Sequence, residues 1–192
     1  AKYVEGFPND NETQTLFDYL FFGHFEPGLK STLTLKLMRD VIRSRLISVL
    51  RERESLVYSP YISLVYDGIP WGIFYFDINA SADNRNMPGI DVLLKDILQK
   101  EVDLEELQTI KRSFRIAKRE ALNEEASATW RSTLVGLLKN GESLADFERY
   151  EECLDSITPA ALREAFERYL DIENYVLLYL SKKQLNNDTK NN

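Results

Sequence analysis

Residues 31–53 carry the most constraining pattern in this sequence, a run of apolar side chains spaced as on one face of a helix. The stripe recurs at steps of three and four, at Leu35, Met38, Ile42, Leu46 and Val49. A helix with such a stripe must bury that face against another layer of structure. The flanking segments have a different character, because 15–22 is short and aromatic and 58–66 is rich in β-branched and aromatic residues. The pattern therefore predicts a long helix between two strands.

A β-hairpin is predicted directly after this helix. Residues 73–80 alternate, with Phe74, Phe76, Ile78 and Ala80 sharing one face. The intervening DGIPWG has the composition of a turn. Pro60 near the start of the first strand favours an edge position or a bulge there, since proline cannot donate to a ladder.

The rest of the chain is predicted to be mainly helical and to end in an apolar strand at 174–180. Helical spacing or capping residues occur over 90–98, 103–121, 130–138, 143–154 and 158–169. The order of strand, helix, two strands, helices and strand is satisfied most simply by an α+β domain. We expect two layers: a mostly antiparallel sheet of about four main strands, with helices packed on one face.

The length and polarity of the chain limit how many domains it can form and which kinds of partner it can bind. A chain of 192 residues, 44% of them hydrophobic, can bury one sizeable core. We expect a linker or flexible start at 1–14, a single domain at 15–181 and a flexible tail at 182–192. No apolar run is long enough to span a bilayer, and a net charge of −7 disfavours nucleic acid as a partner. The polar start bears on secretion only if the chain has not been cut from a longer precursor.

Residues that could carry out catalysis are scarce. A catalytic zinc normally needs three protein ligands including histidine, and His24 is the only histidine, so an H-x-x-E-H site cannot be built. His24 and Glu26 form a two-residue pair, for which an ordinary loop histidine is the simpler interpretation. Cys153 falls within a helical pattern and is interpreted as a small apolar residue. The paired carboxylates are interpreted as solvated helix faces: Glu105/Glu106, Glu124/Glu125 and Glu151/Glu152.

The stretch LRERESLVYSP places Arg51 and Tyr58 on either side of the predicted helix-to-strand junction. Taken alone, these residues have ordinary explanations. Cations favour the negative end of a helix dipole, and tyrosine is common in strands.

The pattern R-E-x-x-x-L-x-Y at this junction nevertheless resembles the arginine and tyrosine element of the insulinase/pitrilysin family of zinc metallopeptidases. Two further stretches are similar to that family: DLEELQTIKRSFRIAKREAL to a long helix, and SITPAALREAFERYLDIENYVLLYL to the closing segment. The stretch TLKLMRDVIRSRLISVLRERESLVYSP, which contains the junction itself, is also similar to a helix of that family. Together they cover about 15–180 in the family's order. No single piece is specific, whereas the ordered set is, and large bacterial members are the most similar.

The resemblance implies a role for the junction. In that family two halves, each of two related α/β domains, enclose a chamber, and the first domain carries H-x-x-E-H and a distant glutamate on zinc. A later domain supplies an arginine, which hydrogen-bonds the substrate backbone. It also supplies a tyrosine, which donates to the oxyanion as zinc-bound water attacks. By this resemblance Arg51 and Tyr58 contact substrate and not metal.

The resulting expectation is a substrate-binding, chamber-forming domain of a zinc-dependent metalloendopeptidase that lacks the zinc motif and is inactive alone. Its partners would be a zinc-bearing catalytic domain, in the same or another chain, and an extended peptide. The similar bacterial proteins suggest the periplasm or cell envelope. Two alternatives stay open: a non-catalytic structural or assembly domain of a degenerate peptidase-like protein, and an unrelated domain with a closed apolar pocket for a small molecule.

Overall fold

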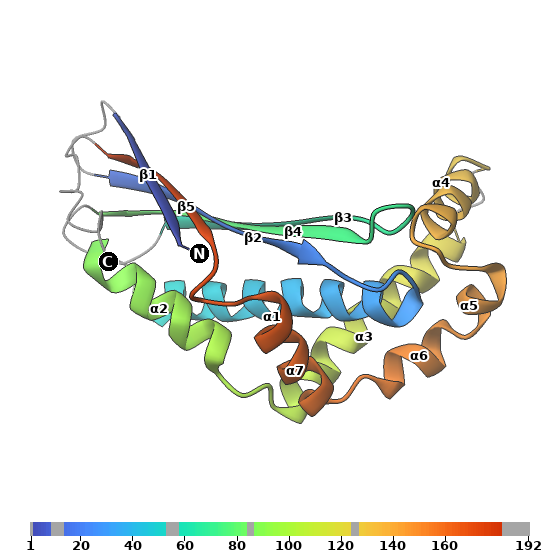
Figure 1. Ribbon diagram of the computed structural model, residues 1–192. Coiled ribbons are helices and arrows are strands. Elements are labelled where there is room, and N and C mark those ends of the chain that lie inside the picture. The colour runs from blue at the N-terminus through green and yellow to red at the C-terminus, as the bar shows by residue number, and fades with distance from the viewer. Residues whose placement is uncertain (1, 9–13, 53–57, 84–86, 124–126, 182–192) are drawn as a thin grey trace.

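The structure, a computed structural model, describes residues 2–8, 14–52, 58–83, 87–123 and 127–181. A five-stranded sheet forms one layer and the helices lie mainly along one of its faces (Figure 1). The strands, in chain order, are β1 (Tyr3–Pro8), β2 (Gln14–His24), β3 (Tyr58–Asp67), β4 (Ile73–Asp83) and β5 (Val176–Ser181). This architecture confirms the expected α+β class, with one strand more than the four main strands predicted.

The sheet has the strand order β1-β5-β2-β4-β3. Neighbouring pairs β5–β2, β2–β4 and β4–β3 are antiparallel, and β1 pairs with β5 in parallel. The predicted hairpin is therefore β3–β4, and its register shifts between Tyr58 and Tyr61. This irregularity includes Pro60, as predicted from the missing N–H of proline.

Strand β1 corrects one expectation, because it lies within the segment 1–14 that the sequence predicts to be a linker. Its side chains are exposed, so the strand has no apolar alternation that sequence could reveal. Backbone pairing with β5 holds it instead, and Gly6 makes room for the buried ring of Tyr179. A Cβ atom at Gly6 would lie 2.2 Å from Cζ of that ring.

The helices fall where the sequence predicts them, with one exception. Their bounds are α1 (Leu29–Glu52), α2 (Met87–Gln99), α3 (Leu104–Asn123), α4 (Ser127–Lys139), α5 (Leu144–Glu148), α6 (Tyr150–Ser156) and α7 (Pro159–Tyr169). The predicted helix at 143–154 is two short helices, α5 and α6, separated at Arg149, whose ψ of 8° departs from the helical value.

Local chemistry explains several helix ends. Thr158 accepts a hydrogen bond from the Ala161 N–H, with Pro159 in the first turn of α7. Ser143 and Asp146 form a reciprocal capping box on α5. Gly141 follows α4 with a φ of +69°, a conformation that favours glycine at the end of a helix.

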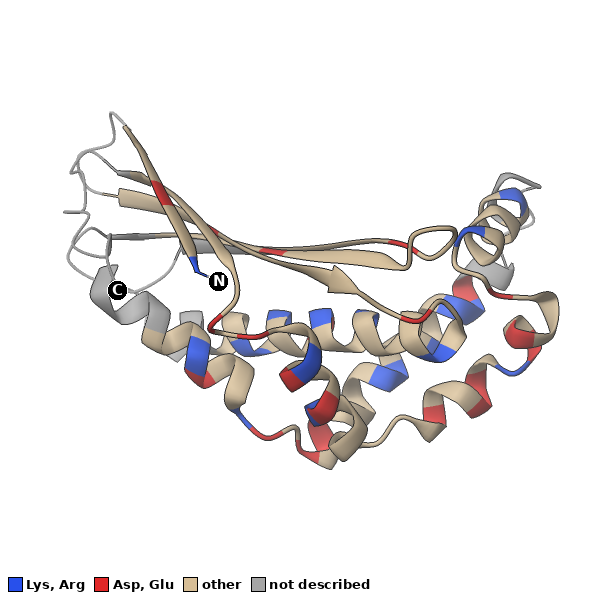
Figure 2. Cartoon of the chain, in the orientation of Figure 1, with Lys and Arg blue, Asp and Glu red and all other residues tan. Residues whose placement is uncertain are grey.

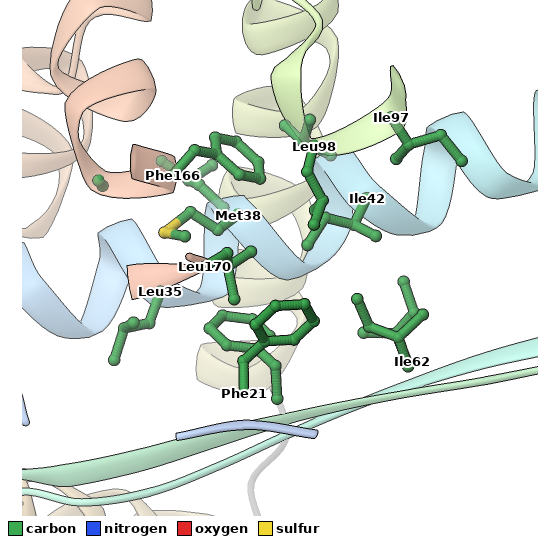
Figure 3. Packing of buried hydrophobic residues seen from close by; sticks show 14 of the residues in the cluster. Phe21, Leu35, Met38, Ile42, Ile62, Ile97, Leu98, Phe166 and Leu170 are labelled. Carbon is green, nitrogen blue, oxygen red and sulfur yellow. The ribbon is translucent and has the colours of Figure 1, made fainter. Parts of the chain in front are cut away.

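The core lies between the sheet and α1, which runs along the length of the sheet. Phe21 of β2 and Ile62 of β3 point from the sheet toward Met38 and Ile42 of α1 (Figure 3). Phe166 and Leu170, from α7 and its end, belong to the same buried cluster. The predicted apolar stripe of α1 is buried at each of its described positions, Leu35, Met38, Ile42 and Leu46. The helix layer is thus held to the sheet through one continuous apolar cluster.

Candidate functional site

The predicted site lies at the junction between α1 and β3. Arg51 belongs to the last turn of α1, and Tyr58 is the first residue of β3, paired with Ser81 of β4. Both therefore lie at the end of the domain away from the β3–β4 turn (Figure 1). The side chains of Arg51 and Tyr58 lie outside the described part of the chain, so their contact with each other and with substrate stays a prediction.

A buried arginine anchors the end of α1 that leads into this junction. Arg45 is 5% exposed and makes a bidentate ion pair with Glu106, at 3.0 Å from Nε to Oε1 and 2.8 Å from Nη2 to Oε2. It also donates to three carbonyl oxygens at the end of α2 and just beyond it, those of Ile97, Lys100 and Glu101, at 2.8 to 2.9 Å. All five N–H groups of the guanidinium are thereby used. Arg45 is thus a positioning residue that the sequence reasoning missed.

Glu106 corrects the interpretation of the glutamate pairs as solvated faces. Its side chain is only 18% exposed because it faces Arg45. The Asp103 side chain accepts the N–H of Glu106 at 2.7 Å, as in the predicted cap of α3. Glu151 and Glu152 do lie on an exposed helix face, where they pair with Arg115 and Arg149. Glu124 and Glu125 lie outside the described residues.

A second buried cation fixes α3 to the segment between α6 and α7. Lys111 is 1% exposed, and its Nζ donates to the carbonyl oxygens of Ile157 at 2.6 Å and Asp155 at 3.2 Å. Burial lowers the pKa of this amine, while the nearby Asp155 carboxylate acts in the opposite sense. Since the amine binds the end of α6, we interpret Lys111 as structural.

The described residues do not form a metal centre. No three or more His, Cys, Asp or Glu side chains among them are grouped so as to hold an ion. His24 and Glu26 are exposed at the end of β2 and in the following loop, and Cys153 is half-buried in α6, where burial raises the pKa of its thiol. Within the described part of the chain, the helices are too short or too polar to cross a bilayer.

The structure also bears on the small-molecule alternative. A cavity lined by Tyr19, Phe21, Leu94, Lys95, Ile172 and Tyr175 has a volume of about 10 Å³. That is room for one water molecule at most, far below the size of a metabolite site. This cavity therefore gives the small-molecule alternative no support.

Comparison with known proteins identifies the fold. No family model and no curated protein matches the sequence. Among solved structures, the periplasmic protease PqqL from Escherichia coli superposes with a TM-score of 0.76 at 16% identity, over 95% of this chain. The peptidase M16 inactive domain from Pseudomonas fluorescens gives 0.70 at 17% identity and 95% coverage. A predicted insulinase family protease from Yersinia pestis gives 0.65 at 11% identity and 94% coverage.

The chain therefore has the fold of an insulinase-like peptidase domain. It spans only 21% of the PqqL chain, 44% of the Pseudomonas fluorescens chain and 42% of the Yersinia pestis chain. The fold thus corresponds to part of each of these proteins. At these levels of identity the likeness establishes architecture, so activity must be argued from residues.

Proposed function

We propose that this chain is a substrate-binding, chamber-forming domain of a zinc-dependent metalloendopeptidase and is inactive by itself. Zinc would be bound by a partner catalytic domain, in the same or another chain, because this sequence cannot supply the histidines. The substrate would be an extended peptide. The bacterial periplasm or cell envelope is the proposed location, by likeness to the periplasmic PqqL.

The observation that carries this proposal is the placement of the α1–β3 junction within an insulinase-like fold. Arg51 and Tyr58 are brought to one end of the domain by secondary structure. The ion pair between buried Arg45 and half-buried Glu106 supports the helix that carries Arg51. In the proposed enzyme, two donors of this domain must point at a substrate that is bound at the zinc of another domain. Such a site requires rigid support.

The chemistry of the two side chains suits a peptide bond under attack. Arginine is permanently charged, and its planar group donates to backbone carbonyls, while a phenol is a neutral donor at pH 7. Arg51 would hold the substrate backbone, and Tyr58 would donate to the oxyanion of the attacked carbonyl. Donors of this kind act most strongly where water is excluded.

The test uses the whole protein that contains this domain. Tyr58→Phe is expected to lower kcat for peptide hydrolysis by about 100- to 1000-fold, the usual effect of losing an oxyanion donor. Arg51→Ala, which removes a contact to the substrate backbone, is expected to lower kcat/KM. Tyr61→Phe, at an exposed position of the same strand, is the matched control and should leave turnover unchanged. Full turnover in both Tyr58→Phe and Arg51→Ala would refute the proposed roles.

The second candidate function is structural, as a non-catalytic domain of a degenerate peptidase-like protein. The likeness to an inactive M16 domain favours it. The whole protein distinguishes the two: under the structural alternative it hydrolyses no peptide with zinc present, and the Arg51 and Tyr58 variants change only stability or assembly.

A further inference from the structure

The face of the sheet that points away from the helices, here called the open face, is apolar. Alternation along the strands leaves large side chains exposed there: Leu16, Phe22, Tyr61, Val65, Ile73 and Tyr75. Register places Phe22 opposite Tyr75, and Tyr75 opposite Val65, in one row across three strands. No described helix lies over this face in Figure 1. Exposed apolar surface that is continuous over several strands marks an interaction site.

The charge of the open face has a single sign. The five strands contain no lysine or arginine, although the chain has 24 of these residues. Glu5, Asp18, Asp67 and Asp77 all fall on the open face by register. Figure 2 shows the strands marked only by acidic residues, with the basic ones concentrated on the helices. The open face is therefore both apolar and acidic.

Two of these carboxylates lie close together at the centre of the face. Asp18 is paired with Asn79 and Asp77 with Leu20, so the two acids are diagonal neighbours on adjacent strands. The surrounding positions of the same face hold Ser63 from β3 and Val176 and Leu178 from β5. Glu5 of β1 lies opposite Leu178 and adds a third carboxylate, and β1 contains no lysine or arginine.

Asp77 is a half-buried residue, and one of its carboxylate oxygens has no donor among the described residues. Its Oδ1 atom is buried and has no hydrogen-bond partner within the described part of the chain. Burial raises the pKa of this carboxyl, and the charge of Asp18 raises it further. A cation brought to the open face would offset the charge of this half-buried carboxylate and that of Asp18.

We propose that the open face binds a protein surface that is apolar and presents a lysine or arginine to Asp18 and Asp77. Charge complementarity favours a cationic protein surface as the partner, because the acidic face would repel anionic lipid and nucleic acid. A second copy docked face to face would bring the two sets of carboxylates together. The proposal does not depend on Arg51 or Tyr58, and goes beyond the peptidase function.

The test uses two synthetic peptides as probes, one a helical peptide of leucine, alanine and lysine, the other with glutamate at each lysine position. Binding to the chain is measured by fluorescence anisotropy at physiological ionic strength. The lysine peptide is expected to bind and the glutamate peptide to bind far more weakly. The variant Asp18→Asn/Asp77→Asn should weaken binding of the lysine peptide by roughly tenfold, equivalent to about 1.4 kcal/mol.

The control variant Glu120→Gln/Glu164→Gln removes the same charge from exposed positions on α3 and α7, and should leave the affinity unchanged. Circular dichroism should show that both double variants fold. Asp18→Lys should shift the preference toward the glutamate peptide.

Three outcomes would overturn the proposal. Equal losses in the two double variants would mean that only net charge attracts the peptide. Binding of phosphatidylcholine vesicles in place of the peptides would assign the face to a membrane. Dimers that dissociate in Asp18→Asn/Asp77→Asn would assign it to a second copy of the chain.

Discussion

At the scale of single residues, Arg45 fixes the later part of α1 to α2 and α3. It links α1, the end of α2 and the start of α3 through side-chain hydrogen bonds. Its partners lie 52 to 61 residues away in sequence. The partners of Arg45 could not be predicted from the sequence. Its position directly before Leu46 of the apolar stripe is the one sequence signal that it lies near the core.

Arg45→Ala is expected to destabilise the domain by about 3–5 kcal/mol, because the half-buried Glu106 carboxylate loses its partner. Urea denaturation measures the change. Arg43→Ala, at an exposed position of the same helix, should change stability by less than about 0.5 kcal/mol. Equal effects of the two substitutions would contradict the anchoring role.

Asp77→Asn tests the electrostatics of the open face. The pKa of Asp77 in the folded chain is raised, so the ionised side chain destabilises the fold. This loss of stability is absent at pH values below the pKa that Asp77 has in the unfolded chain. It grows as pH rises toward the pKa of Asp77 in the folded chain, and it is complete above that pKa. The variant should therefore have a higher Tm than the natural chain at pH 7, and the difference should disappear in acid. A Tm difference that does not depend on pH would contradict this prediction.

At the scale of elements, what the sequence could predict follows from burial. The strands and helices that bury one face carry a visible period, as in α1 and β4. Strand β1 buries no side chain and carries no period, so the sequence predicts a linker there. The break between α5 and α6 falls at Arg149, where no proline or glycine indicates the end of a helix. Roles that depend on a partner domain, such as those of Arg51 and Tyr58, came only from resemblance.

Gly6→Ala is expected to detach β1 without unfolding the domain. The new methyl group would meet the ring of Tyr179, which is 4% exposed and cannot move aside easily. Hydrogen exchange should show lost protection of the β1 amides, with β2 and β4 unchanged. Gly136→Ala in α4, where nothing lies within 4 Å of the added atom, should instead stabilise its helix by about 0.5–1 kcal/mol. Retained β1 protection in Gly6→Ala would contradict this account.

Lys111→Met tests the link between α3 and the segment after α6. The substitution preserves most of the volume but leaves the carbonyl oxygens of Ile157 and Asp155 without this donor. We expect a loss of about 1–3 kcal/mol in the free energy of unfolding. Arg112→Ala, exposed on the same helix, is the control. A Lys111→Met chain as stable as the natural one would show that the two hydrogen bonds contribute little.

At the scale of the whole molecule, the chain is expected to be independent of metal. A chelator should leave its Tm unchanged, because no cluster of three or more candidate ligands exists among the described residues. The isolated chain should also hydrolyse no peptide, with or without added zinc. A Tm that falls on chelation, or zinc-dependent cleavage by the purified chain, would contradict the proposed division of labour between domains.

The Arg45 network also has a consequence for synthesis on the ribosome. The chain is synthesised from its amino end, so α1 is made before residues 97–106 exist to accept its guanidinium bonds. Until then the guanidinium of Arg45 lacks these partners. The junction that carries Arg51 and Tyr58 is thus completed only after residues 97–106 have been added.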